Sequence, residues 1–210
     1  MQLTADAVAV AGTRSPLVRP TSFTAPPSRV TAVAGDPGYG QVALALALAG
    51  RMPLASGRVL LDGVEDTPAL QRHVALVDVP EVSAPEDGLA VHHVVAEELA
   101  FAGRPSGRRA VAGFLERHGV LAAAGAPFER LAPEERVRVL TSAAAERAAT
   151  RVLVVTNPDR RGGDPRLWWP LLEAHAASGL TVVVQLTHAT MRQLALPVRA
   201  ELGSVEEVAA

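Results

Sequence analysis

The chain has 210 residues and a formal net charge of −2, which suits one main domain over residues 1–210 and excludes a basic surface for nucleic acid. It has no cysteine, and all 20 of its lysine-plus-arginine residues are arginine, so thiolate chemistry and lysine chemistry are both excluded. No apolar run approaches the roughly 20 residues that span a bilayer and no signal segment is evident, so we expect a cytoplasmic protein.

The first predicted elements are a strand, a glycine-rich loop and a helix. Residues 29–34 form a short apolar, β-branched run, residues 35–40 are rich in glycine, and residues 41–50 have a helix-forming composition. Two further short strands are predicted at residues 57–63 and 74–78, which are bounded by glycine, acidic and proline residues.

The middle of the chain differs in character from both ends. Residues 89–147 are rich in alanine with helical spacing, which predicts a small, mostly helical lobe. Strand character returns at residues 152–155 and 180–186, and the intervening residues 167–178 predict a helix. This order is typical of a parallel β-α-β unit, so we predict an α/β fold with a parallel sheet as its core.

Two details of the C-terminal part are also predicted. Pro170 is expected in the first turn of its helix, where the missing N–H costs nothing. The tail, residues 195–210, is predicted to be a strand or loop followed by a frayed helix.

The glycine-rich loop is the first candidate site. Gly35, Gly38 and Gly40 keep the G-x-x-x-x-G spacing of a phosphate loop, in which the next two residues are normally lysine and Ser/Thr. That lysine neutralises terminal phosphates and that hydroxyl holds Mg²⁺. Here the two residues are Gln41, which carries no charge, and Val42, which cannot ligate a metal. Taken alone, the three glycines suit a purely structural turn equally well.

Residues 47–63, which follow the loop, contain further motifs that help to interpret it. Residues 47–50 run into Ser-Gly-Arg-Val at 56–59 and Leu-Asp-Gly at 61–63. In this order the motifs resemble the ATP-binding cassette of ABC transporters, and the resemblance extends along nearly the whole chain. It implies a P-loop NTPase-like fold. The family's glutamine after the next strand, which senses the Mg²⁺-bound γ-phosphate and contacts the permease, is missing near Val79.

The signature loop of that family, LSGGQ, aligns with Leu-Ala-Pro-Glu-Glu at residues 131–135. In the family, its serine and glycines donate to the γ-phosphate held by the partner subunit. Pro133 has no N–H to donate, and Glu134 brings negative charge towards a polyphosphate. The preferred local interpretation is an ordinary helix start, with proline and acids in its first turn.

Two further positions of the family's chemistry can be compared. Thr156 and Asn157 stand where the resemblance implies the magnesium aspartate and the water-polarising glutamate, and we interpret the nearby Asp159 as a solvated loop residue. His188 follows the last strand, like the family's switch histidine, although the preferred interpretation is a polar cap at the end of a buried strand.

No metal site is predicted. His92 and His93 are adjacent, so they do not share a helix face, and we interpret both as solvated.

The resemblance therefore indicates a nucleotide-binding fold with degenerate motifs, a pseudoenzyme. The leading hypothesis is a non-catalytic structural or regulatory subunit that needs no cofactor. Its partner would be a second cassette subunit or an integral-membrane permease, which would place it at the inner face of the membrane. The alternative is a transporter subunit that retains weak ATP and Mg²⁺ binding or hydrolysis. A third hypothesis is a free-standing interaction module unconnected with transport.

Overall fold

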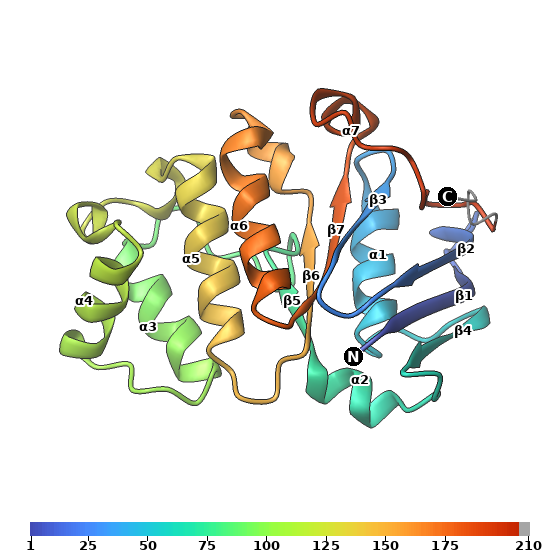
Figure 1. Cartoon of the computed structure of the whole chain (residues 1–210), viewed down its shortest axis with the longest axis horizontal. Coiled ribbons are helices and arrows are strands. Elements are labelled where there is room, and N and C mark those ends of the chain that lie inside the picture. Colours follow the sequence, from blue (N-terminus) through green and yellow to red (C-terminus); the bar gives the residue numbers. More distant parts are fainter. Residues whose placement is uncertain (206–210) are drawn as a thin grey trace.

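The computed structural model describes residues 1–205 and contains two β-sheets (Figure 1). The larger sheet is parallel, and its strands in spatial order are β3 (Val30–Ala34), β7 (Thr181–Leu186), β6 (Val152–Thr156) and β5 (Val74–Val77). The smaller sheet is antiparallel, with the order β2 (Val18–Ala25), β1 (Leu3–Val10) and β4 (Ser56–Leu61).

The helices occupy three places around these sheets. Helix α1 (Tyr39–Leu48) lies between the two sheets, and α2 (Thr67–His73) leads into β5 (Figure 1). Helices α6 (Pro165–Ala177) and α5 (Pro133–Ala145) cover the other face of the parallel sheet, and α7 (His188–Gln193) follows β7. The lobe consists of α3 (Val91–Phe101), α4 (Arg108–Arg117) and α5, with short 3-10 turns at Leu121–Ala123 and Phe128–Arg130. A third 3-10 turn, η3, spans Pro158–Arg161.

The parallel sheet forms because its strands are apolar on both faces. Val152 and Val154 of β6 face α1, whereas Leu153 and Val155 pack with α5 and α6. Every residue of β6 and β7 is buried, as expected for a parallel sheet covered on both sides. Each such side chain contributes about 1.5–3 kcal/mol relative to an exposed one.

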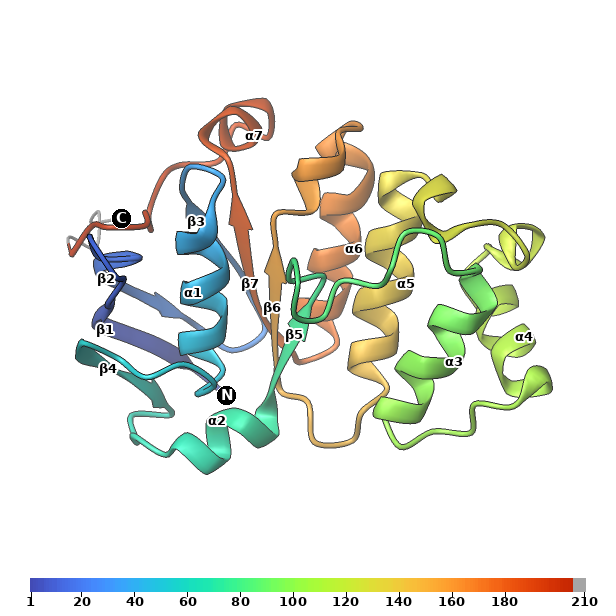
Figure 2. The ribbon, with the colours of Figure 1, turned by 180° about the vertical axis from the view of Figure 1, so that it is seen from behind.

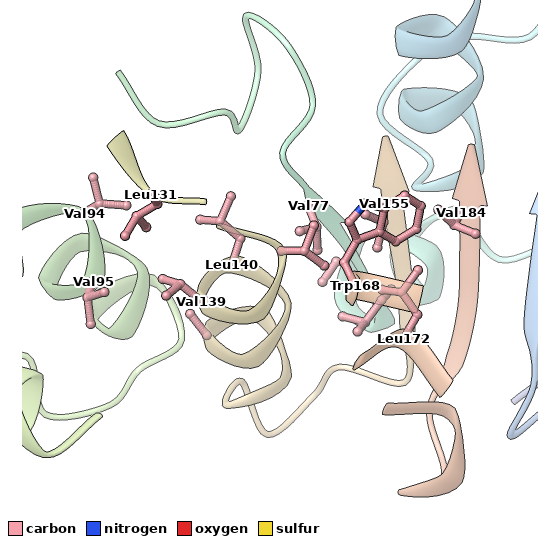
Figure 3. Close-up of a cluster of buried hydrophobic side chains, with 14 of the residues drawn as sticks. Val77, Val94, Val95, Leu131, Val139, Leu140, Val155, Trp168, Leu172 and Val184 are labelled. Carbon is pink, nitrogen blue, oxygen red and sulfur yellow. The ribbon is translucent and has the colours of Figure 1, made fainter. Parts of the chain in front are cut away.

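The helical lobe shares this core with the sheet. Figure 3 shows Trp168 and Leu172 of α6 beside Val155 of β6, then Leu140 of α5, and then Val94 of α3. Helix α5 is therefore buried from both sides, towards the sheet and towards α3.

The fold class predicted from the sequence is confirmed, since a parallel sheet carries a mostly helical lobe. The N-terminal strands β1 and β2 were not predicted. The placement of Pro170 was wrong: Asp164 caps the helix by accepting from the N–H of Arg166 at 3.0 Å, so α6 begins at Pro165 and Pro170 lies beyond its first turn.

The predicted frayed helix of the tail falls partly outside the described residues, because the structure describes the chain only to residue 205. Within the described part, Glu201 forms a parallel bridge with Ala34 at the edge of β3. None of the helices in residues 1–205 is both long and apolar enough to cross a membrane.

Candidate functional site

The phosphate-loop residues lie between the end of β3 and the start of α1. The side chain of Gln41 is 2% exposed and folds back onto the loop. Its Nε2 donates to the carbonyl oxygens of Gly35 at 2.9 Å and Asp36 at 3.2 Å. Val42 packs against the core with its neighbours on α1. Neither side chain offers a charge to a phosphate, and Val42 offers no ligand to a metal.

A buried chain of neutral hydrogen bonds joins this loop to β6. Nε2 of Gln185, in β7, donates to the backbone carbonyl of Gln41 at 2.9 Å. The Oε1 atom of Gln185 accepts from the hydroxyl of Thr156 at 2.8 Å. The structure thus brings together Gln41 and Thr156, which the sequence identified, through Gln185, which the sequence analysis missed. A single amide within the otherwise apolar strand Thr181–Leu186 was the available signal.

Asn157 follows Thr156 in a left-handed backbone conformation, with φ of 46°. Asparagine tolerates this region better than most residues. Its side chain is buried, and its Nδ2 has no hydrogen-bond partner among residues 1–205; the same holds for Oε1 of Gln41. Each unpaired buried polar atom costs about 1–3 kcal/mol. Asn157 carries no negative charge with which to polarise a water molecule.

Asp159 does not lie free in solvent, so its interpretation as a solvated loop residue was wrong. Its Oδ2 accepts from the N–H of Thr187 at 3.0 Å, from the hydroxyl of Thr187 at 2.7 Å and from the hydroxyl of Thr190 at 2.6 Å. The carboxylate therefore fastens η3 to the start of α7. An acid at a helix N-terminus is stabilising, so Asp159 has a structural role.

His188 is the first residue of α7 and contacts two acids. Its Nε2 lies 3.0 Å from Oε1 of Glu201, and its Nδ1 lies 3.9 Å from Oδ1 of Asp36. The histidine thereby connects α7 with the phosphate loop and with the segment that follows α7. Glu201 gave no sequence signal, because its contact depends on how residues 200–202 run beside β3.

The loop glycines are in contact with this same segment. A Cβ atom at Gly35 would lie 3.0 Å from Cβ of Leu202, and one at Gly40 would lie 2.8 Å from the carbonyl oxygen of Leu17. Both glycines are therefore needed for close packing, with or without a phosphate. A Cβ atom at Gly38 would have no such neighbour within 4 Å among residues 1–205.

The residues that align with the signature loop form the first turn of α5. Pro133 is the first helical residue, and the carboxylate of Glu135 accepts from the N–H of Ala132 at 3.0 Å. A Cβ atom at Gly163 would lie 2.8 Å from Cγ of Pro133, so the proline packs closely on the loop before α6. Glu134 lies beside it, in the turn where acids suit the helix dipole.

The two adjacent histidines are not equivalent. His92 is half-buried, with Nδ1 2.6 Å from the carbonyl oxygen of Ala124, so its interpretation as solvated was wrong. His93 is exposed. Within residues 1–205, no three histidine or acidic side chains are grouped to hold a metal ion.

An ionic cluster that sequence reasoning missed lies near the position of the family's absent glutamine. Asp78 follows β5 and is 6% exposed, and Arg136 of α5 is 3% exposed. The guanidinium donates to both carboxylate oxygens, from Nε at 2.9 Å and from Nη2 at 2.6 Å. Arg160 adds a third contact to Asp78 at 2.7 Å.

A groove of about 670 Å³ opens between the end of α1, helices α3 and α5, and the segment that joins β5 to α3. Glu97 and Glu98 lie on one side of it, Arg51 and Arg147 also line it, and Phe101 at its edge is 81% exposed. Burial, with smaller contributions from Glu97 and Asp78, raises the pKa of Glu98 to about 7.

No protein-family model matches the sequence, and no curated protein matches it. Among solved structures, a nucleotide-free ATP-binding cassette from an ABC transporter is similar with a TM-score of 0.72 and 15% identity, over 100% of this chain and 90% of that one. The ATP-binding subunit of an ABC transporter gives a TM-score of 0.64 and 15% identity, over 92% of this chain and 82% of that one. The chain therefore has the ATP-binding-cassette fold, as the order of its motifs predicted.

Proposed function

We propose that this chain is a non-catalytic protein of the ATP-binding-cassette fold, a structural or regulatory subunit that acts without nucleotide. The observation that carries the proposal is the buried amide of Gln41, which is bonded to the carbonyls of Gly35 and Asp36. A working phosphate loop needs a positive charge at this place. In this chain the group at that place is the neutral amide of Gln41, and its N–H groups already donate to carbonyl oxygens of the protein.

The rest of the site supports the same conclusion. The hydroxyl of Thr156 is bonded to Gln185, and Asn157 is neutral, so the positions implied for a magnesium ligand and a catalytic base lack carboxylates. A charged hydrogen bond contributes about 1.5–3 kcal/mol, so losing two of them weakens binding by a factor of about 10² to 10⁴. Micromolar ATP affinity would thus move towards the millimolar range.

The groove beside α3 is the surface we propose for a partner. It combines an exposed aromatic side chain, Phe101, with an acidic side at Glu97 and Glu98. Exposed apolar surface rimmed by polar residues marks protein interfaces, where aromatic residues are enriched. A second cassette subunit or an integral-membrane permease fits the proposal, and a permease would hold the chain at the inner face of the membrane.

Calorimetry with Mg-ATP tests the proposal directly. We expect no binding below about 1 mM, and a dissociation constant in the low micromolar range would refute the proposal. A variant carrying Gln41→Lys, Val42→Thr, Thr156→Asp and Asn157→Glu restores the four polar groups. Circular dichroism first establishes that this variant folds, and we then expect it to bind Mg-ATP more tightly than the parent chain.

One observation favours the alternative, a subunit with weak ATP binding. Oε1 of Gln41 and Nδ2 of Asn157 are buried polar atoms without partners in the part of the chain that the structure describes, and they lie at the carboxyl ends of the strands, where open α/β sheets bind ligands. If ATP binds and the binding is lost in both Gln41→Ala and His188→Ala, this alternative replaces our proposal.

A further inference from the structure

The segment that joins β5 to α3, residues 79–90, forms one wall of the groove. It contains no helix or strand, and Figure 2 shows it crossing α5 on its way to the lobe. Val82, Pro85 and Leu89 are among its groove-lining residues. Its internal bonds are local: the N–H groups of residues 82–84 all donate to the carbonyl oxygen of Val79, at 2.9 to 3.1 Å. Local bonds of this kind fix a turn but not its position. Towards its end the segment is also joined to the lobe by two backbone bonds, from the N–H of Phe128 to the carbonyl oxygen of Leu89 at 2.8 Å and from the N–H of Glu129 to that of Asp87 at 3.1 Å, whereas its start has the ionic contacts described next.

An acid near each end of the segment is held by arginines from other parts of the chain. At the start, Asp78 is bound by Arg136 of α5 and by Arg160 of η3. Towards the end, Asp87 lies 2.6 Å from Nη2 of Arg161 and 3.7 Å from Nη1 of Arg136. Arg136 thus reaches both acids.

These contacts differ in how much they contribute to stability, because they differ in burial. Asp78 and Arg136 are both more than nine-tenths buried and form two parallel hydrogen bonds, a geometry that is strong and directional. The guanidinium also lies over the ring of Phe128, 4.8 Å from its centre, which fixes it further. Removing one partner of a buried pair leaves an unpaired buried charge and is strongly destabilising, whereas the exposed pair of Arg161 and Asp87 adds little.

We propose that Asp78, Arg136, Arg160, Arg161 and Asp87 form a permanent clamp, which holds residues 79–90 against α5 and η3 and keeps the groove formed without nucleotide. Arg136 is the central positioning residue, because it alone in this cluster contacts both acids. Every atom of the clamp belongs to the protein, so its closure depends on no ligand. The use of the groove by a partner rests on the proposed function, but the clamp itself does not.

Hydrogen exchange on the full chain, measured with and without Mg-ATP, tests the clamp. The probes are the amides of Val91, Phe128 and Glu129, because their backbone bonds join the end of the segment to residues 126–129 of the lobe. We expect them to exchange at least tenfold faster in Arg136→Met and in Asp78→Asn than in the parent chain, while amides in β6 and β7 are unchanged. Arg138→Met is the control on the same helix, since the side chain of Arg138 bonds only the carbonyl of His118 among the described residues; it should leave the three probes unchanged.

The double variant Asp78→Asn with Arg136→Met separates the clamp from general stability. It buries no unpaired charge, so we expect it to recover most of the stability that each single variant loses. The three probe amides should nevertheless remain fast. If either single variant does not fold, this double variant and Arg160→Met, which removes a contact from a partly exposed side chain, give the same readout.

Several outcomes would overturn the clamp. These are fast exchange of the probe amides in the parent chain, parent-like protection in the double variant, or a change in their exchange when Mg-ATP is added. Failure of the proposed function gives a different result. In that case ATP binds in calorimetry, while the protection of the probe amides stays the same with and without it.

Discussion

Replacing Glu98 by glutamine is expected to stabilise the protein at pH 8 and to have little effect at pH 5. Glu98 lies on α3 at the groove, and its pKa is raised from 4.5 to about 7, chiefly by burial. A carboxyl with a raised pKa binds its proton more tightly in the folded chain than in the unfolded one. Its favourable contribution is therefore complete below pH 4.5 and is lost as the pH rises through about 7.

The size of the effect follows from the two pKa values. At about 1.36 kcal/mol per pKa unit, the difference between 4.5 and about 7 gives an upper limit of about 3 kcal/mol. Glu98 is only partly buried, so solvent screening reduces this limit, and we expect a gain of about 1–2 kcal/mol at pH 8. For a chain of this length, that gain corresponds to a rise in Tm of roughly 2–8 °C.

Urea unfolding of the parent chain and of Glu98→Gln at pH 5 and pH 8 measures this gain. Glu97→Gln is the matched control, because Glu97 is the exposed neighbour on the same helix and should give a smaller change. A gain in Glu98→Gln that is equal at both pH values, or a loss at pH 8, would contradict the reasoning. A loss would mean that Glu98 is ionised in the fold and paired with Arg51 or Arg147 across the groove.

The remaining predictions concern the site and its glycines. Asn157→Glu alone should give no ATP hydrolysis above the parent chain in a coupled assay, because a water-polarising base is idle without bound metal and phosphate. Gly40→Ala should lower the free energy of unfolding by about 1–3 kcal/mol, because the new Cβ atom would meet the carbonyl oxygen of Leu17. Gly113→Ala, in the interior of α4, should instead raise it by about 0.5–1 kcal/mol. Urea unfolding measures both changes. Light scattering with Mg-ATP, alone or with a cassette partner, should detect no ATP-driven association.

The sequence predicted the elements that are encoded locally. The buried strands Val152–Thr156 and Thr181–Leu186 are apolar runs between helices, and glycine spacing marked the loop before α1. The antiparallel sheet was missed because β1 is irregular: Ala7 has a φ of 48°, and its pairing with β2 and β4 shifts register near this residue. Its pairing with β4, some fifty residues away, has no local signal.

The ionic contacts were missed for a related reason. Asp78 and Arg136 are 58 residues apart, and the sequence around each residue gives no sign that the two side chains are in contact. Asp159 was misinterpreted because a carboxylate after a proline is usually a solvated loop residue. Its three donors come from Thr187 and Thr190, which are 28 and 31 residues further along the chain. Such pairs become visible only once the topology is known.

The motif positions that are kept and those that are lost differ in what they contact. Gly35 and Gly40 pack against Leu202 and Leu17, and His188 lies against two acids of the same chain, so each has a role that does not require a nucleotide. The groups that the resemblance implies and this chain lacks include the lysine, the hydroxyl, the two carboxylates, the glutamine near residue 79, and the serine and glycines of the signature loop. Most of these would contact phosphate, Mg²⁺ or the attacking water. This contrast supports our proposal of a protein that acts through its shape and its surface, without nucleotide.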